Sequence, residues 1–93
     1  MEQKLRFARS ATKHRVSRSR TRYVIEHAGM RFSVRTPDPA GDPRVLFLGD
    51  DQHSIPLEVM AVELESGELQ VIHSMPLRAK YVTEYKEAAP WRV

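Results

Sequence analysis

Four stretches in the middle of the chain have the residue pattern of β-strands. Residues 30–36 alternate between apolar side chains at Met30, Phe32 and Val34 and polar ones, which predicts a half-buried strand. Residues 37–43 hold three prolines and a glycine, so they are expected to form a loop. Runs rich in β-favouring residues predict three further strands, at 45–49, 56–64 and 69–75.

Two helices are predicted before the first strand. Residues 2–13 carry a weak apolar stripe, which indicates an amphipathic helix among basic residues. Ser17 is a suitable N-cap for a second helix over residues 17–27, and Gly29 provides its end. The outer face of this second helix is strongly basic, with arginines at Arg18, Arg20 and Arg22.

A C-terminal helix is predicted over residues 76–87. Ser74 can cap it, and Pro76 suits a first helical turn because its missing N–H would be unpaired there. The helix should stop near Ala89, since Pro90 disfavours helical geometry in the residue before it. The element order predicts an α+β fold with two N-terminal helices, a four-stranded, mainly antiparallel sheet covered on one face, and a C-terminal helix.

The connection at 65–68 decides which side chains of the last two strands face each other. If Ser66 and Gly67 form a two-residue hairpin loop, Glu58 and His73 are diagonal neighbours on one face, roughly 7–8 Å apart at Cα. A three-residue loop with a bulge changes this register and separates the two residues. The two-residue loop predicts four facing pairs: Leu64 with Leu69, Val62 with Val71, Met60 with His73, and Glu58 with Met75.

Length and composition limit the classes of protein that this chain can be. The 93 residues, 41% of them apolar, are expected to form one domain over residues 1–93 without a large cofactor cleft. There is no cysteine, and the four histidines lack metal-site spacing, so we expect neither a metal nor another cofactor. The apolar runs are too short to span a bilayer and the N-terminus lacks a signal-peptide stretch, so a cytoplasmic protein without membrane contact is expected.

The charges are distributed in blocks along the chain. Residues 1–36 have ten Lys/Arg against two Asp/Glu, residues 37–70 have one against eight, and residues 71–93 have four against two. Two basic ends that flank an acidic middle suit a protein that presents one face to a polyanion and another to a basic partner. The alternative is that both signs are mixed over one solvated surface, since sequence blocks need not form spatial patches.

A set of polar and aromatic residues is predicted to gather where the last strand meets the last helix. A carboxylate or histidine there can take the proton from a ribose 2′-OH, and a second acid can protonate the leaving 5′-oxygen. Arginine or lysine can offset the charge that grows on the phosphorane, and tyrosines can stack on single-stranded bases. Such a set can cleave RNA without a metal. Its members are Glu58, His73, Arg78, Lys80, Tyr81 and Tyr85.

Each member also has an ordinary structural explanation. His73 can be a polar residue at a strand end, and Glu58 can be a solvent-facing strand residue. Tyr81 and Tyr85 have the i,i+4 spacing of residues that pack together on a helix. The arginines of the second helix can bind an RNA backbone or simply form a solvated helix face.

Several short motifs resemble the BrnT-type members of the RelE toxin superfamily. A lysine-histidine step opens the second helix, a Leu-Glu-Val strand entry follows, and the last strand leads through a histidine into a basic, tyrosine-bearing segment. Arg15 occupies the position after the histidine where that pattern usually has glycine, and Ser74-Met75-Pro76 replaces its serine-alanine-arginine step. The resembling motifs are KHRVS at 13–17, GD at 49–50, LEV at 57–59, IHSM at 72–75 and RAKY at 78–81.

The resemblance implies the toxin of a type II toxin–antitoxin pair, a metal-independent endoribonuclease that cleaves mRNA, often at the ribosome. Its expected partners are RNA and a cognate antitoxin protein, with which it would form a hetero-oligomer. Acid/base roles are expected for His73 and Glu58, phosphate contacts for Arg78 and Lys80, and stacking or proton donation for Tyr81. Arg18, Arg20, Arg22 and Tyr85 are expected to contact RNA. Two alternatives stay open: a non-catalytic RNA- or protein-binding module that uses the basic N-terminal helices, and a degenerate toxin that only binds its antitoxin.

Overall fold

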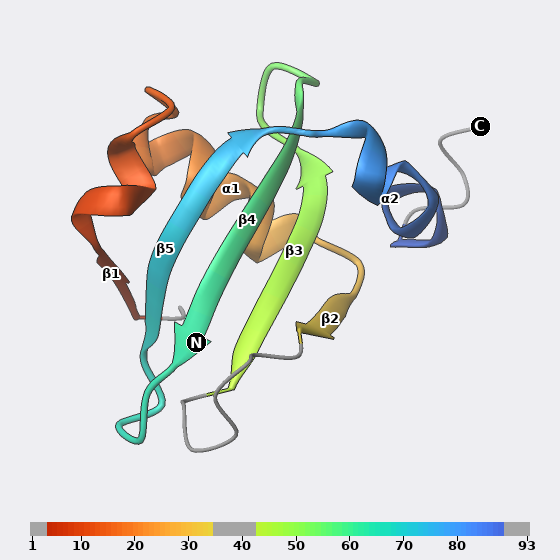
Figure 1. Ribbon diagram of the computed structural model, residues 1–93. Coiled ribbons are helices and arrows are strands. Elements are labelled where there is room, and N and C mark those ends of the chain that lie inside the picture. Colours follow the sequence, from red (N-terminus) through yellow and green to blue (C-terminus); the bar gives the residue numbers. More distant parts are fainter. Residues whose placement is uncertain (1–3, 35–42, 89–93) are drawn as a thin grey trace.

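The computed structural model describes residues 4–34 and 43–88 and has an α+β fold built on one five-stranded mixed sheet. The strands lie in the order β1-β5-β4-β3-β2, and Figure 1 shows α1 behind the sheet and α2 beside β3. The elements are β1 (Leu5–Phe7), the 3₁₀ turn η1 (Arg9–Thr12), α1 (Arg18–His27), β2 (Arg31–Val34), β3 (Arg44–Asp50), β4 (Pro56–Glu63), β5 (Leu69–Pro76), the 3₁₀ turn η2 (Ala79–Tyr81) and α2 (Val82–Ala88).

The first predicted helix, over residues 2–13, is wrong. Its described part forms β1, which pairs in parallel with β5, followed by η1. Leu5 and Phe7 are two residues apart, so they point to the same side of a strand and pack against the core together. The edge of β5 offers unpaired backbone groups that β1 satisfies, and this pairing outweighs a weak helical stripe. The predicted four-stranded sheet therefore gains a fifth, parallel strand.

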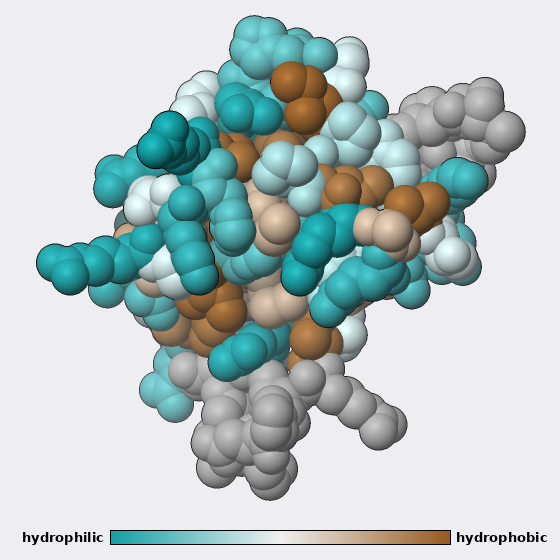
Figure 2. Space-filling model, turned by 45° about the horizontal axis from the view of Figure 1, so that its top comes forward, coloured by the Kyte–Doolittle hydropathy of each residue, from teal (hydrophilic) through white to brown (hydrophobic). Residues whose placement is uncertain are grey.

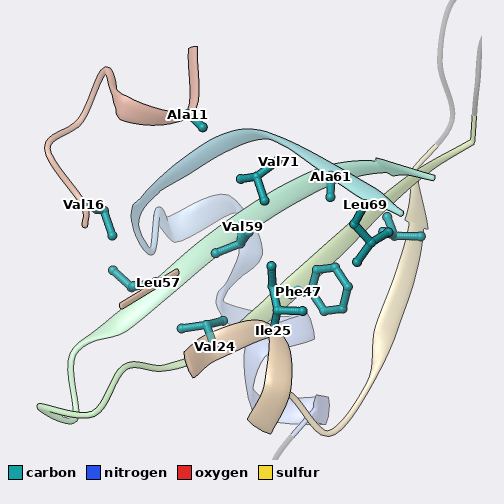
Figure 3. Packing of buried hydrophobic residues seen from close by; sticks show 11 residues of the cluster. Ala11, Val16, Val24, Ile25, Phe47, Leu57, Val59, Ala61, Leu69 and Val71 are labelled. Carbon is teal, nitrogen blue, oxygen red and sulfur yellow. The ribbon is translucent and has the colours of Figure 1, made fainter. Parts of the chain in front are cut away.

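The second predicted helix is confirmed as α1. The Ser17 hydroxyl accepts a hydrogen bond from the backbone N–H of Arg20 at 3.2 Å, which is the contact expected of an N-cap. The helix buries Thr21, Val24 and Ile25 against one face of the sheet. Figure 3 shows Val24 and Ile25 directed at the inward residues of β3, β4 and β5, among them Phe47 and Val59. This apolar layer is the main core of the protein.

The opposite face of the sheet is covered over β3 by α2. Leu46 and Leu48 alternate with the core residues of β3, so they lie on this second face, and both are buried. Asp50 lies on the same face of β3 as Leu46 and Leu48, and its Oδ1 accepts a hydrogen bond from the Tyr85 hydroxyl of α2 at 2.5 Å. Helices therefore cover both faces of the sheet, whereas the sequence pattern predicted a cover on one face. Over β4 and β5 this second face leaves Met60, His73 and Met75 half-buried.

The β4–β5 hairpin departs from the predicted register by one residue at its loop, and a bulge farther along β5 restores that register. Its loop is longer than the predicted two residues: Leu64 N–H donates to Glu68 O, and Gly67 adopts a φ of 89°, as in a three-residue loop with a glycine bulge. Near the loop Glu63 therefore faces Leu69, and the predicted pairs Leu64–Leu69 and Val62–Val71 are wrong. Beyond a second bulge the predicted pairs Met60–His73 and Glu58–Met75 are confirmed.

The second bulge lies at Ile72, an extra residue of β5 between the partners of Ala61 and Met60. The Ile72 carbonyl accepts a hydrogen bond from the Ser10 hydroxyl of η1 at 2.6 Å. If the pairing register near the loop continued along β5 without this bulge, His73 would lie opposite Val59, on the core face. The bulge therefore turns His73 to the same face of the sheet as Glu58.

The C-terminal helix begins later than predicted. Ser74 and Pro76 belong to β5, and Leu77 N–H continues the pairing by donating to Pro56 O at 3.1 Å. Ser74 does not cap a helix, because its hydroxyl is buried and lies 2.7 Å from the Thr21 hydroxyl of α1. Helical structure starts only after Arg78. The predictions for residues 35–42, Ala89, Pro90 and the start of the first helix at Glu2 lie outside the described residues.

Candidate functional site

The Glu58 carboxylate is the centre of the candidate site. Although it lies on a strand, its side chain has no exposed surface. Oε1 accepts from His73 Nε2 at 2.9 Å and from Arg78 Nε at 2.6 Å, while Oε2 accepts from the backbone N–H of Arg78 at 3.0 Å. Burial raises the pKa of this carboxyl, but the hydrogen bonds from Arg78 and His73 outweigh burial and hold the pKa below its ordinary value. Glu58 is therefore a buried, ionised acceptor.

His73 presents its imidazole at the open face of the sheet. Its side chain is 23% exposed, and Nε2 is directed at Glu58. Because an ionised carboxylate only accepts hydrogen bonds, Nε2 carries the proton in this pair, and the lone pair of the neutral ring is on Nδ1. No side chain or backbone group in the described ranges hydrogen-bonds Nδ1. His73 is thus oriented by a carboxylate and can accept a proton.

Arg78, Lys80 and Tyr81 lie together just after β5. The Arg78 side chain is 43% exposed, although its guanidinium binds Glu58, whose charge raises the pKa of Arg78 through that hydrogen bond. The Arg78 guanidinium is 5.7 Å from the centroid of the Tyr81 ring, and the Lys80 amine is 4.9 Å from it. Two cations and one aromatic ring therefore lie next to the Glu58–His73 pair, a combination that suits a phosphate and an unstacked base.

The arrangement changes the role expected for Glu58. Both carboxylate oxygens are hydrogen-bonded and buried, so Glu58 does not reach a substrate, and as an ionised group it has no proton to donate. Its hydrogen bond instead orients the His73 ring, with Nε2 directed at the carboxylate. Glu58 is a positioning residue, and the groups that remain accessible are His73, Arg78, Lys80 and Tyr81.

The residues expected to contact RNA from α1 and α2 are not part of this arrangement. Tyr85 is half-buried and its hydroxyl binds Asp50. Arg20 forms an ion pair of 2.6 Å with the buried Asp51, and the Arg18 guanidinium lies 5.2 Å from the Phe7 ring. Because α1 covers the opposite face of the sheet, its arginines do not extend the site formed by Glu58 and His73.

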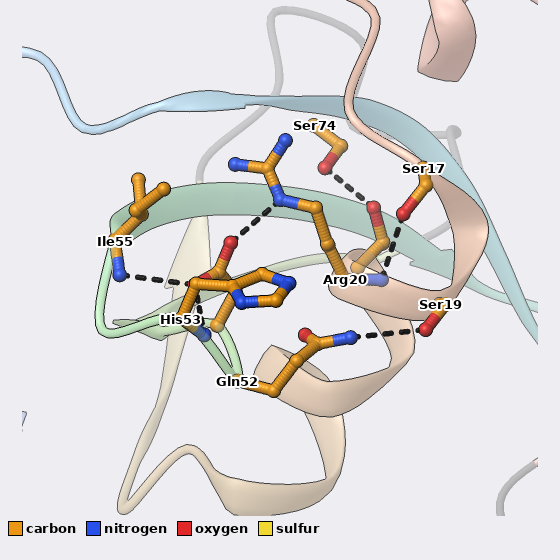
Figure 4. A network of polar contacts seen from close by, with 9 residues as sticks. Ser17, Ser19, Arg20, Gln52, His53, Ile55 and Ser74 are labelled. Atoms are coloured by element: carbon orange, nitrogen blue, oxygen red, sulfur yellow. Dashed lines mark hydrogen bonds and ion pairs between the residues drawn. The ribbon is translucent and has the colours of Figure 1, made fainter.

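The Arg20–Asp51 ion pair belongs to a network that ties the start of α1 to the β3–β4 connection (Figure 4). Asp51 also accepts from the backbone N–H groups of His53 at 2.8 Å and Ile55 at 3.0 Å. Burial raises the pKa of Asp51, but the hydrogen bonds from Ile55, Arg20 and His53 together hold it below its ordinary value. His53 contributes its backbone to this network, which serves the structure of the connection.

The acidic block of the sequence does not form one patch. Glu58 and Asp51 are buried in the separate networks described above. At the hairpin end of the sheet, Glu68 pairs with Arg6 at 3.1 Å and Glu63 lies 3.8 Å from Arg31. Each of these four carboxylates thus lies next to an arginine. Figure 2 turns the top of Figure 1 toward the viewer. On this side, small apolar patches lie between hydrophilic side chains.

One neighbour of the site was missed among the candidate residues. The His14 ring lies against the His73 ring, with centroids 5.7 Å apart and planes at 70°. His14 is far from His73 in the sequence, and the available signal was its place in the KHRVS motif, which was used only to locate the start of α1. Arg15, in the following position of that motif, adopts a φ of 60°.

Three negative observations complete the description. In the ranges 4–34 and 43–88 no group of three or more His, Asp or Glu side chains is placed to hold a metal ion, and no helix is long and apolar enough to cross a membrane. Comparisons with protein-family models, with curated proteins and with solved structures gave no match.

Proposed function

We propose that this chain is a metal-independent endoribonuclease of the RelE/BrnT kind, the toxin of a type II toxin–antitoxin pair that cleaves mRNA. The observation that carries the proposal is the triplet formed by Glu58, His73 and Arg78. A buried carboxylate holds an imidazole and a guanidinium next to each other on an accessible face of the sheet. A base and a phosphate-binding cation in fixed proximity are the groups that RNA cleavage needs.

The chemistry follows from the accessible atoms. Nδ1 of His73 takes the proton from a ribose 2′-OH, and the resulting oxygen attacks the adjacent phosphorus. The guanidinium of Arg78 and the amine of Lys80 offset the negative charge that develops on the phosphorane. The P–O5′ bond breaks, leaving a 2′,3′-cyclic phosphate and, after protonation, a 5′-hydroxyl. Tyr81 stacks on the base beside the scissile bond.

Three structural features support the link to the BrnT-like pattern. One residue from each of the motifs at 57–59, 72–75 and 78–81 meets the other two at the site, although the motifs belong to three different segments of the chain; the three residues are Glu58, His73 and Arg78. Arg15, which stands where that pattern has glycine, keeps a positive φ that glycine adopts without strain. The antiparallel part of the sheet, from β2 to β5, and the helical segment after it support a RelE/BrnT-like architecture.

The first test is induced expression of the full chain in a bacterium, with growth and new RNA 5′ ends followed together. We expect the wild type to arrest growth and to produce discrete 5′-hydroxyl ends. His73→Ala and Arg78→Ala should abolish both effects. His27→Ala is the matched control, because His27 is an exposed histidine of α1, on the helix that covers the other face of the sheet.

The second test is cleavage by the purified protein. An RNA oligonucleotide should be cut, and the same sequence with a single 2′-deoxy nucleotide at the cleaved position should resist, because it lacks the attacking hydroxyl. Arg78→Lys should lower the rate tenfold or more, about 1.4 kcal/mol, since lysine keeps the charge without the guanidinium fork. Equal cutting of both oligonucleotides would contradict the proposed chemistry.

RNA binding without cleavage would instead support the non-catalytic module. That outcome predicts an affinity that falls steeply with salt and depends on Arg18 and Arg22 more than on Arg78. Binding only to a basic antitoxin segment, with no effect on RNA, would identify a degenerate toxin. Co-expression with the neighbouring open reading frame and co-purification of the two chains test the expected hetero-oligomer.

A further inference from the structure

His14 lies beside the candidate base without a structural task of its own. Its ring contacts His73 at a centroid distance of 5.7 Å, and the residue is exposed. In the described ranges no hydrogen bond or ion pair involves the His14 side chain.

The segment that carries His14 is held firmly on the end of β5. Ala11 and Val16 are buried in the core on either side of it. The Ser10 hydroxyl donates to the carbonyl of Ile72, the residue before His73. Arg15 adopts a left-handed φ of 60°, which for a non-glycine residue costs roughly 1–2 kcal/mol and is more common at functional positions than elsewhere. These contacts place His14 over His73 before any ligand binds.

We propose that His14 is the general acid that protonates the leaving 5′-oxygen. This inference rests on the proposed ribonuclease function and supplies the proton donor that the triplet of Glu58, His73 and Arg78 lacks. As the P–O5′ bond breaks, the imidazolium of His14 transfers its proton to O5′, and the imidazolium of His73 holds the proton taken from the 2′-OH. Proton exchange with water restores both rings, so no further reactant is required.

The environment of each ring decides which histidine has which role. Nε2 of His73 is engaged by the buried Glu58 carboxylate, which leaves Nδ1 as the accessible acceptor, so His73 suits the base. His14 has no such partner among the described residues, and its exposed ring lies against the His73 ring, so a ring N–H of His14 is available to a ligand bound at His73. Arg78 is a poor donor, because its bond to Glu58 raises its already high pKa.

The test compares two substrates that differ in one atom. The first is an RNA dinucleotide step with its normal 5′-oxygen, and the second has sulfur in place of that bridging oxygen, which leaves without protonation. On the normal substrate, His14→Ala and His14→Gln should be slower than the wild type by about 10²- to 10⁴-fold. On the sulfur substrate both variants should approach the wild-type rate. His73→Ala should be slow on both substrates, and His27→Ala should be normal on both.

Each outcome separates the inference from the function on which it rests. If folded His14→Ala and His14→Gln cleave the normal substrate at the wild-type rate, His14 is not the acid and the ribonuclease function stands. If both variants are equally slow on the two substrates, His14 acts through contact alone and the inference is overturned. If Tyr81→Phe is the variant that sulfur rescues, the acid is Tyr81. A wild type that cuts neither substrate overturns the function itself, and this inference with it.

Discussion

The backbone N–H and the guanidinium of Arg78 both donate to the carboxylate of Glu58, at 3.0 Å and 2.6 Å. Twenty residues separate the two in sequence. These two contacts bind the segment after β5 to the start of β4. Arg78 is extended, and the helical segment begins only at the next residue. The two contacts also mean that a single buried carboxylate determines both the local backbone and the placement of the accessible cation. Stability and the candidate chemistry are therefore coupled through Glu58.

Replacing Glu58 by Gln should destabilise the protein. The amide keeps the size of the side chain but turns one acceptor into a donor that faces Arg78 and His73, which are donors themselves. We expect a loss of roughly 1.5–3 kcal/mol in the free energy of unfolding, measured by urea denaturation. Glu63→Gln is the control, because its 3.8 Å contact with Arg31 is exposed and should contribute less than about 1 kcal/mol. Equal stability of the two variants would contradict the buried role of Glu58.

Acid should unfold the protein through Glu58 and Asp51. The pKa of each carboxyl is lower in the folded chain than its ordinary value of about 4, so each group binds fewer protons folded than unfolded in this range. Their stabilisation is therefore complete above about pH 5 and is lost as the pH falls through the folded pKa values. The urea concentration at the midpoint of unfolding, measured at several pH values, should decrease as the pH is lowered below about 5. In Asp51→Asn this midpoint should depend less steeply on pH than in the wild type. The same pH dependence in both proteins would exclude Asp51 as a cause.

The buried hydroxyl pair between α1 and β5 can be tested by a double-mutant cycle. Thr21 and Ser74 are 1% exposed each and their hydroxyls lie 2.7 Å apart. Thr21→Val leaves the Ser74 hydroxyl unpaired, at a cost of about 1–3 kcal/mol. Adding Ser74→Ala removes that unpaired group, so the double variant should lose less than the sum of the single variants. Thermal or urea unfolding of the four proteins measures the coupling, and strict additivity would show that the hydroxyls do not interact.

Arg15 should accept glycine but not a β-branched residue. Its φ of 60° is free of strain for glycine and most costly for valine. We expect Arg15→Gly to be as stable as the wild type or slightly more stable, and Arg15→Val to lose roughly 1–2 kcal/mol. Arg9→Val, at another exposed position of the same segment, controls for the loss of charge. Equal unfolding free energies for the glycine and valine variants would contradict the positive φ.

Local sequence patterns were sufficient for the elements whose own residues specify them. The alternation around Phe32 predicted β2, and Ser17 marked the start of α1 through a contact three residues away. Runs of β-favouring residues likewise predicted strands at 45–49, 56–64 and 69–75, where the structure has β3, β4 and β5. The types of residue at the candidate site were also evident, because a histidine near the end of β5 is followed closely along the chain by arginine, lysine and tyrosine.

The tertiary structure decided what depends on contacts between distant segments. No local pattern distinguishes β1 from a helix, since its strand geometry arises from pairing with β5, which is more than sixty residues away. Likewise, the extra residue Ile72 cannot be read from the hairpin alone, yet it decides whether His73 faces Glu58 or the core. A one-residue change of register reverses every side chain of a strand, so short-range propensities of a few tenths of a kcal/mol do not determine it. The contacts of η1 with β5 and the Thr21–Ser74 hydrogen bond of α1 hold this register instead, and the segment that follows η1 brings His14 to the site.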